Sequence, residues 1–256
     1  MFDIYIWNSR FLLTGDEFSE EFHSHYPVQI ILSPGKPVRA CLKNGSCVVS
    51  EFLMIRSSAE HRCFIEGRSL SLFIDPETGQ GRRLTARFEQ EEVVSLSGCL
   101  SRGAEEAASL FLKSAGALRR EAEEIFETLL YSVIEKDEAD RQIDPRIACV
   151  LERIAAVPDK MISLPELAGE VCLSESRLMH LFKENIGIPV RRYLLWKRMM
   201  DGILLIREGA ELTFAALEAG FSDYAHFSRT FKRHFGTGPK TLKNSRFVHV
   251  FTGDSL

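Results

Sequence analysis

The stretch A-G-F-S-D-Y-A-H-F-S-R-T-F-K-R-H-F-G-T-G-P, at residues 219–239, carries the strongest structural signal in this 256-residue chain. It predicts a tight turn at G-F-S, where glycine can adopt a positive φ, and then a helix over residues 223–234 that Ser222 caps. Phe227 and Phe231 lie one helical turn apart and predict a buried face, which leaves a polar and basic outer face. A shorter apolar-striped helix precedes the turn. This arrangement is typical of motifs that place their second helix in the major groove of DNA.

The same plan occurs upstream, over residues 163–187. Ser163 can cap a short helix that has Glu166 in its first turn. After a tight turn, Ser174 can cap a second helix over residues 175–184, whose inward positions are apolar and whose outer positions are polar. The chain therefore predicts two helix-turn-helix motifs, with capping serines at 174 and 222.

A long helix over residues 190–207 is predicted between the two motifs. Eighteen helical residues make a rod of roughly 27 Å, which is close to the ~34 Å between successive major grooves on one face of DNA. Gly202 lies in the middle of this helix, where glycine costs about 1 kcal/mol relative to alanine. We therefore expect a packing reason for it.

Charge is unevenly distributed along the chain, whose net charge is −4. Residues 1–145 carry 16 Lys and Arg against 24 Asp and Glu, whereas residues 146–246 carry 16 against 11. The C-terminal segment can thus approach phosphates while the acidic segment stays off the duplex.

Residues 146–246 resemble the DNA-binding domain of the AraC/XylS family of transcriptional regulators. The resemblance rests on L-x-x-L-A at 164–168, S-x-x-x-L-x-x-L-F-K at 174–183 and the stretch quoted above. It implies a cytoplasmic regulator rather than an enzyme, with double-stranded DNA and RNA polymerase as partners. Activation is the expected mode, and repression is the alternative that the sequence leaves open.

The family's DNA contacts carry over by position onto eleven side chains: Ser176, Arg177, Met179, His180, Lys183, Tyr224, His226, Ser228, Arg229, Lys232 and Arg233. The three lysine and arginine positions 183, 232 and 233 suit phosphates, and Arg229 suits a guanine edge. Met179 offers only apolar contact. Any one of these side chains can alternatively be an ordinary solvated residue. Phe214 departs from the family pattern, being apolar at a position off the buried face.

Residues 1–90 read as β-structure, with short β-prone runs at 28–32, 47–49, 52–55 and 70–74 separated by turn signals. This spacing predicts a sandwich or barrel. The segments E-F-H-S-H-Y-P-V-Q at 21–29 and A-E-H at 59–61 resemble the two halves of a cupin motif. The predicted fold class is α+β multidomain: a cupin-like β-barrel with a helical hairpin, then an all-α double helix-turn-helix domain.

His23, His25 and Gln29 share strand parity, so they would lie on one face, and His61 could converge on them. Three imidazoles form a metal-ligand pattern, and a divalent metal bound by His23, His25 and His61 is one interpretation. Metal-binding cupins usually have a carboxylate where this chain has Gln29. The alternatives are a pocket for an organic effector, or hydrogen-bonded histidines around no ligand.

Two helices, over residues 104–114 and 118–134, should follow the β-region. The second has an apolar stripe at 118, 122, 125, 129 and 133, which either packs on the β-domain or pairs with a second subunit in a homodimer. A polar linker and a helix over 146–156 come next. The predicted domains are 1–100 (effector or sensor), 101–135 (dimerisation hairpin), 136–145 (linker), 146–246 (DNA binding) and 247–256 (tail).

Six scattered cysteines form no C-x-x-C pair and predict reduced thiols in the cytoplasm. No apolar run is long enough for a membrane span, and the N-terminus lacks a secretory signal. An enzymatic cupin, and a regulator controlled only by partner proteins, are the competing interpretations of the N-terminal domain.

Overall fold

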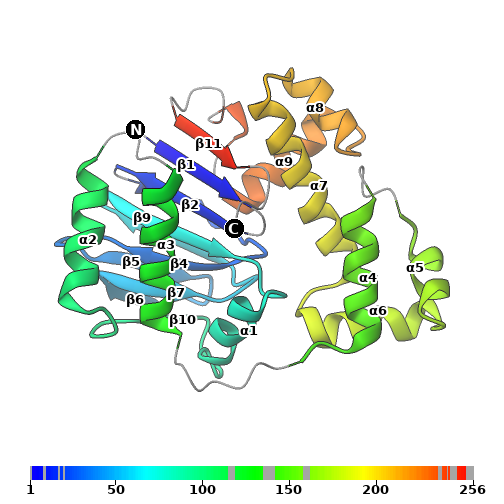
Figure 1. Cartoon of the computed structure of the whole chain (residues 1–256), viewed down its shortest axis with the longest axis horizontal. Helices are drawn as coiled ribbons and strands as arrows, with labels where there is room; N and C mark the ends of the chain where they lie inside the picture. Colours follow the sequence, from blue (N-terminus) through cyan, green and yellow to red (C-terminus); the bar gives the residue numbers. More distant parts are fainter. Residues whose placement is uncertain are drawn as a thin grey trace. The chain divides into compact units, whose positions relative to one another are not determined.

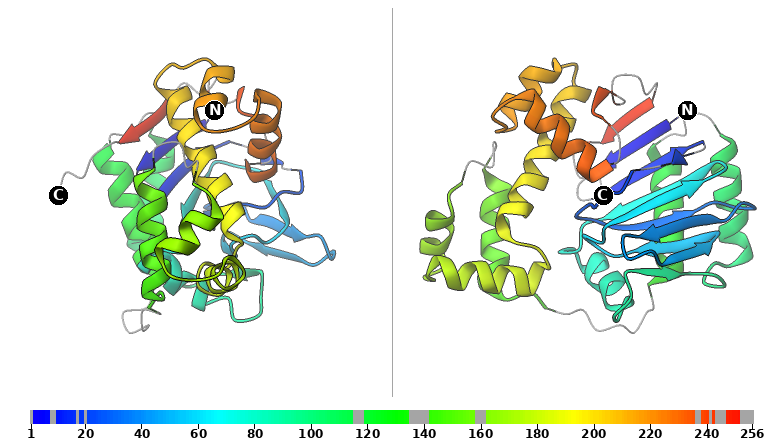
Figure 2. Two further views of the ribbon diagram at one scale, coloured as in Figure 1. Left: turned by 90° about the vertical axis from the view of Figure 1, so that its right-hand side faces the viewer. Right: turned by 180° about the vertical axis from the view of Figure 1, so that it is seen from behind.

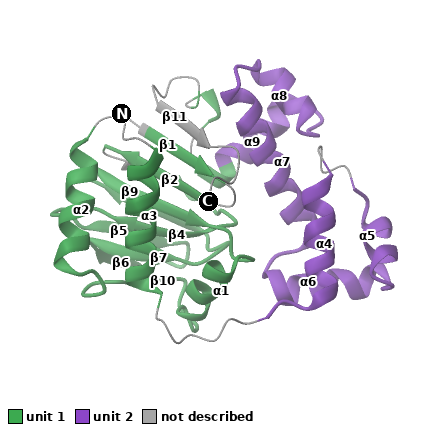
Figure 3. Ribbon diagram, viewed as in Figure 1, with its two compact units in different colours: residues 1–140, 233–256 green, residues 141–232 purple. Residues whose placement is uncertain are grey.

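The computed structural model describes residues 2–7, 10–16, 18–19, 21–114, 119–134, 142–157, 162–235, 238–240, 242 and 247–251. The chain divides into two compact units, one of residues 1–140 with 233–256 and one of residues 141–232 (Figure 3). Each unit is described by itself below.

The first unit is built on two β-sheets (Figure 1). The larger sheet has seven strands in the order β10-β7-β4-β9-β2-β1-β11, and the smaller has four in the order β3-β8-β5-β6. Their bounds are β1 Phe2–Trp7, β2 Arg10–Gly15, β3 Phe18–Ser19, β4 Val28–Leu32, β5 Val38–Leu42, β6 Cys47–Ser50, β7 Phe52–Ile55, β8 His61–Ile65, β9 Ser69–Ile74, β10 Val93–Ser95 and β11 Phe247–Phe251. All four β-prone runs lie in strands. Within the described residues, the sheets form a barrel-like pair that is not closed into a ring.

Strand β4, inside the seven-stranded sheet, is buried on both faces. Val28, Ile30 and Leu32 belong to one apolar core, whereas Ile31 belongs to a second core with residues of β5 and β8. The alternation follows from the two-residue period of a strand. One face of the sheet therefore packs on helices, and the other faces the four-stranded sheet. A short helix that the sequence analysis did not predict, α1 Gly79–Ala86, follows β9.

Helices α2 Arg102–Lys113 and α3 Arg119–Val133 cover the sheet (Figure 1). The apolar stripe of α3 faces inward: Ile125 and Leu129 are buried in the core, and the ring of Phe126 packs edge-on against Trp7 with centroids 5.0 Å apart. The first interpretation of the stripe is confirmed. Because these side chains are core residues, pairing a second subunit through them is wrong. Position 118 and residues 136–141 of the predicted 136–145 linker lie outside the described residues.

The predicted tail contains a strand. β11 pairs in parallel with β1, in a register that sets Tyr5 opposite His249. Every other described pairing in the two sheets is antiparallel. The residues after position 251 lie outside the described part of the chain.

The prediction that all six cysteines are reduced is wrong for one pair. The β5–β6 hairpin sets Cys41 directly opposite Cys47, and their sulfurs form a disulfide. Four cysteines form no disulfide: Cys63, Cys99, Cys149 and Cys172. The pairing is a consequence of hairpin register, which cysteine spacing alone does not reveal.

The second unit is helical (Figure 2). It begins with α4 Pro145–Ala156, which Asp144 caps. The remaining helices are α5 Leu164–Glu170, α6 Glu175–Ile186, α7 Val190–Arg207, α8 Leu212–Glu218 and α9 Tyr224–Phe235. The 18-residue α7 runs between the α5–α6 and α8–α9 pairs, as the sequence predicts. Within the described residues, none of the helices has the length and apolar character that a membrane crossing requires.

Candidate nucleic-acid interface and buried histidine centre

The first helix-turn-helix motif is fixed by local side-chain caps. Ser163 and Glu166 form a capping box, in which the Glu166 carboxylate accepts the backbone N–H of Ser163 at 2.8 Å. The hydroxyl of Ser174 accepts from the backbone N–H of Arg177 and starts α6. Gly187 ends that helix in the left-handed conformation, at φ 86°. Such caps satisfy amide groups that a helix end otherwise leaves unpaired.

The outer face of α6 is open to solvent. Leu178, Leu181 and Phe182 are buried against the rest of the unit. The five predicted contact residues of this helix are all exposed: Ser176, Arg177, Met179, His180 and Lys183. Helix α6 therefore presents a polar and cationic surface with one apolar side chain.

The second motif begins its α9 helix differently from the prediction. The cap is Asp223, whose Oδ1 accepts the backbone N–H of His226 at 2.6 Å, and not Ser222. Ser222 instead donates to the other carboxylate oxygen of Asp223. Hydrogen bonds from the His226 amide and the Ser222 hydroxyl lower the pKa of Asp223. A charged cap at a helix N-terminus also suits the helix dipole.

The predicted contact residues of α9 differ in exposure. Arg229, Lys232 and Arg233 are exposed, whereas Tyr224, His226 and Ser228 are half-buried. The ring of His226 packs edge-on against Phe221, with centroids 5.1 Å apart. The three cations are thus the most accessible donors of this helix.

Close packing explains the glycine at position 202, as expected for a glycine in the middle of a helix. A Cβ at this position in α7 would lie 2.8 Å from Cε2 of Phe227 and 3.3 Å from Cβ of Ala219. The glycine therefore lets α7 approach the second motif closely. On α8, Phe214 and Leu217 are exposed, and nothing in the structure explains their apolar character.

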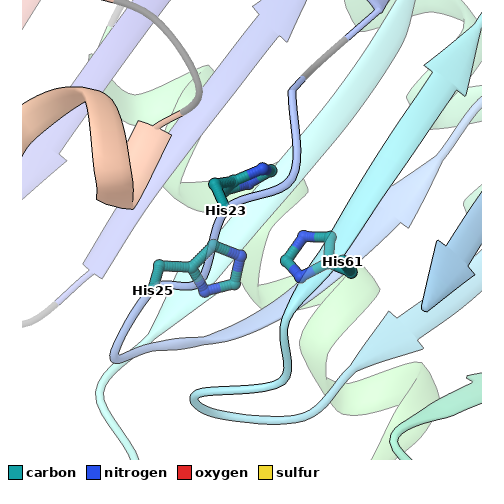
Figure 4. A group of neighbouring side chains, drawn as sticks. All are labelled: His23, His25 and His61. Atoms are coloured by element: carbon teal, nitrogen blue, oxygen red, sulfur yellow. The ribbon is translucent and has the colours of Figure 1, made fainter. Parts of the chain in front are cut away.

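The structure brings together His23, His25 and His61 in the first unit (Figure 4). All three side chains are buried, and the ring centroids of His23 and His61 are 4.4 Å apart. One ligand nitrogen from each ring lies within 4.8 Å of the other two. His23 and His25 precede β4 rather than lying in it, so the shared strand parity with Gln29 does not describe their positions.

Main-chain carbonyls orient all three imidazoles. Nδ1 lies 3.0 Å from the Glu21 carbonyl in His23, 2.8 Å from the Pro27 carbonyl in His25 and 3.0 Å from the Ala59 carbonyl in His61. These contacts fix the proton on Nδ1 and leave the lone pair on Nε2.

Burial controls the protonation of the centre. Desolvation, followed by the charge of His25, lowers the pKa of His23 to about 4. Burial also lowers the pKa of His25 and of His61. The low-dielectric surroundings thus favour neutral rings at neutral pH.

Two further residues complete the surroundings of His25. Its Nε2 lies 2.9 Å from Oε1 of Gln29, whose amide nitrogen donates to Ser71 at 3.4 Å. The ring of Phe73 packs edge-on against His25 at 5.2 Å. Sequence reasoning missed Ser71 and Phe73, although the β4–β9 register that sets Gln29 opposite Phe73 explains their place.

The sequence matches to known proteins include the helical unit. Residues 167–245 match a family model described as a helix-turn-helix domain. The chain is 30% identical over 169 residues to the HTH-type transcriptional activator RhaS of Escherichia fergusonii, covering 65% of this chain and 54% of that protein. It is 33% identical over 86 residues to the arabinose operon regulatory protein of Escherichia coli K12, covering 33% of this chain and 30% of that protein. The C-terminal domain is therefore an AraC-type helix-turn-helix domain.

The fold of the whole chain also has a counterpart among solved structures. A crystal structure of an apo variant of ToxT from Vibrio cholerae matches 93% of this chain and 98% of its own, with a TM-score of 0.60 and 13% sequence identity. Another ToxT structure carries a bound unsaturated fatty acid. At this identity the likeness concerns the fold alone. The chain spans about half the length of the RhaS relative and under a third of the arabinose regulator.

Proposed function

We propose that this protein is a sequence-specific, DNA-binding transcriptional regulator. The observation that carries the proposal is the pair of recognition helices, α6 and α9, with solvent-exposed polar and cationic faces on either side of α7. Double-stranded DNA is the partner, and each helix enters one major-groove segment. RhaS is named as a transcriptional activator, so we propose activation, with RNA polymerase as a further partner in the cytoplasm.

The exposed side chains divide into two roles. We assign the exposed side chains Lys183, Lys232 and Arg233 to phosphate contacts, which position the protein without reading sequence. Arg229 is the strongest base reader, because a guanidinium can donate to both acceptors of a guanine edge. On α6, Met179 suits a thymine methyl and His180 a hydrogen-bonding edge.

The first unit is proposed to sense an effector that modulates DNA binding. ToxT shares its fold and has been crystallised with a fatty acid, which supports a ligand-sensing role for this kind of domain. In the present chain, the site we propose is the histidine centre of His23, His25 and His61 with Gln29 beside it. It acts as a sensor and not as an enzyme active site.

A homodimer would let one complex read two half-sites. The inward stripe of α3 is unavailable, but the outer faces of α2 and α3 carry two large exposed apolar side chains, Leu110 at 67% and Tyr131 at 63% exposure. This outward surface is the one that we propose pairs with a second copy.

Selection of bound duplexes from a random DNA pool by the full-length protein tests the function. We expect an enriched sequence with two conserved blocks about one helical turn apart. The variant Arg229→Ala should lose roughly 1–3 kcal/mol and relax preference at one or two base pairs, whereas its matched control, Lys232→Ala, should weaken all duplexes about equally. Failure to enrich any sequence would contradict the proposal.

A further inference from the structure

We propose that His23, His25 and His61 form a binding site for one divalent transition-metal ion of the zinc class, held through the Nε2 atoms. This inference deepens the proposed function, because it names the effector class. The regulatory consequence of metal binding rests on the proposed function, whereas the metal site itself does not.

The backbone holds the three ligands in place before any ion binds. His23 and His61 face each other in a two-residue bridge, where each backbone N–H donates to the other residue's carbonyl at 2.9 Å. The carbonyl of His25 accepts the N–H of Ser58, in the turn before β8, at 2.8 Å. Two short segments of the chain are thereby fastened together, so ligand binding costs little further ordering.

Each ring is oriented as a metal-ligating histidine is. The carbonyls of Glu21, Pro27 and Ala59 hold the Nδ1 protons. Metal-bound histidines usually donate their other ring N–H to a carbonyl or carboxylate, which fixes the tautomer and raises the basicity of the ligand atom. Here the same second-sphere contact occurs three times in one cluster.

The ring lone pairs of His25 and His61 face no hydrogen-bond donor among the described residues. Nε2 of His61 is buried and has no hydrogen-bond partner among the described residues. Nε2 of His25 carries a lone pair and lies 2.9 Å from the amide oxygen of Gln29, which is another acceptor. Turning over the Gln29 side-chain amide would give His25 a donor, but it would leave Nε2 of His61 without one. A cation relieves both, and burying such groups unpaired is costly.

The size of the cluster suits a single ion. Three atoms that lie within 4.8 Å of one another are all within about 2.8 Å of a common point. Zinc–nitrogen bonds are about 2.0–2.1 Å long, so each ring has to move inward by less than about 1 Å.

The donor set selects the class of ion. The cluster offers three imidazoles without any carboxylate or thiolate among the described residues. The adjacent acid Glu60 is directed away, where it pairs with Lys43 at 2.6 Å. Nitrogen ligands favour Zn2+, Cu2+, Ni2+ and Co2+ over Mg2+ and Ca2+, which prefer oxygen. Three protein ligands leave a fourth position for water, an anion or Gln29.

The test uses the full-length protein purified without a histidine tag, stripped with chelator and titrated with ZnCl2 or CoCl2. We expect one ion per chain, a Co2+ visible spectrum of low-coordinate nitrogen ligation, and a thermal midpoint that rises with added Zn2+. His61→Gln should weaken binding at least 100-fold. The matched control Cys149→Ser removes an exposed thiol of α4, another possible zinc ligand, and should bind Zn2+ as the wild type does.

Gln29→Glu gives an independent outcome if His61→Gln does not fold. A carboxylate beside a bound cation should raise Zn2+ affinity at least 10-fold. If the three histidines bind no ion, the buried carboxylate of Gln29→Glu should instead lower the thermal midpoint, and added Zn2+ should not raise it. That result, or wild-type binding of less than 0.1 ion per chain (roughly a tenth of full occupancy), overturns the inference.

DNA binding measured on the same samples separates the two proposals. If the protein binds no metal but still selects DNA, only the metal inference fails. If it binds one ion per chain but never selects DNA, the metal inference stands and the proposed function fails.

Discussion

Substituting Gly202 with alanine should destabilise the second helix-turn-helix motif, although alanine is the better helix former. The gain in helix propensity is at most about 1 kcal/mol. The new Cβ would lie 2.8 Å from Cε2 of Phe227, a distance that requires something to move. Phe227 is fully buried and packs edge-on against Phe221 with centroids 5.1 Å apart, so its ring has little room to yield. Overpacking of this kind costs typically 1–3 kcal/mol, and we expect a net loss of about 1–2 kcal/mol in the free energy of unfolding.

Urea unfolding followed by tryptophan fluorescence can measure this loss. The chain has two tryptophans, and a Trp7→Phe background leaves only Trp196, which is buried in the same helix, α7, as the substitution. Gly169→Ala, in α5, is the matched control, because its Cβ would meet nothing within 4 Å. It should be neutral or stabilising by up to about 1 kcal/mol. A Gly202→Ala midpoint at or above that of the parent would refute the argument.

Three other predictions follow from the same structure. Asp223→Ala removes the α9 cap and should cost about 1 kcal/mol in urea unfolding, with a smaller effect from Ser222→Ala; equal effects would contradict the assignment of the cap. Burial lowers the pKa of His23 to about 4, so between pH 6.5 and 4 the unfolded chain binds more protons than the folded chain. The thermal midpoint of the metal-stripped protein should therefore fall as the pH is lowered from 6.5 towards 4, and His23→Gln should make this fall smaller. Leu110→Glu with Tyr131→Glu should give a folded monomer in sedimentation experiments, whereas a wild type that is already monomeric at micromolar concentration would exclude the proposed dimer surface.

The helical unit could be predicted closely from sequence because its signals are local. The capping box at Ser163, the turn before Ser174 and the glycine at 187 each act within a few residues of their position. The second cap was predicted one residue too early, since Ser222 and Asp223 can both cap a helix and only the fold selects between them. An error of one residue moves a single hydrogen bond and leaves the faces of α9 unchanged.

The β-unit was less predictable because its pairings are distant in sequence. No local pattern indicates that residues 247–251 pair with β1, or that hairpin register joins Cys41 to Cys47. The stripe of α3 showed that one face is buried but did not show against what. The three histidines do come together, yet through a two-residue bridge and a turn rather than through strand parity. The three histidines were therefore identified correctly from their residue type and motif, whereas the geometry predicted for them was wrong.

Equilibrium binding of the full-length protein to its selected duplex, measured by fluorescence anisotropy over a range of salt concentrations, tests the central claim most directly. Phosphate contacts by the exposed lysines and arginines of α6 and α9 release counterions from DNA. With roughly six such contacts, the slope of log K against log salt concentration should be near −5. Binding that does not depend on salt, or no binding at low salt, would contradict the conclusion that these two helices form a DNA-binding surface.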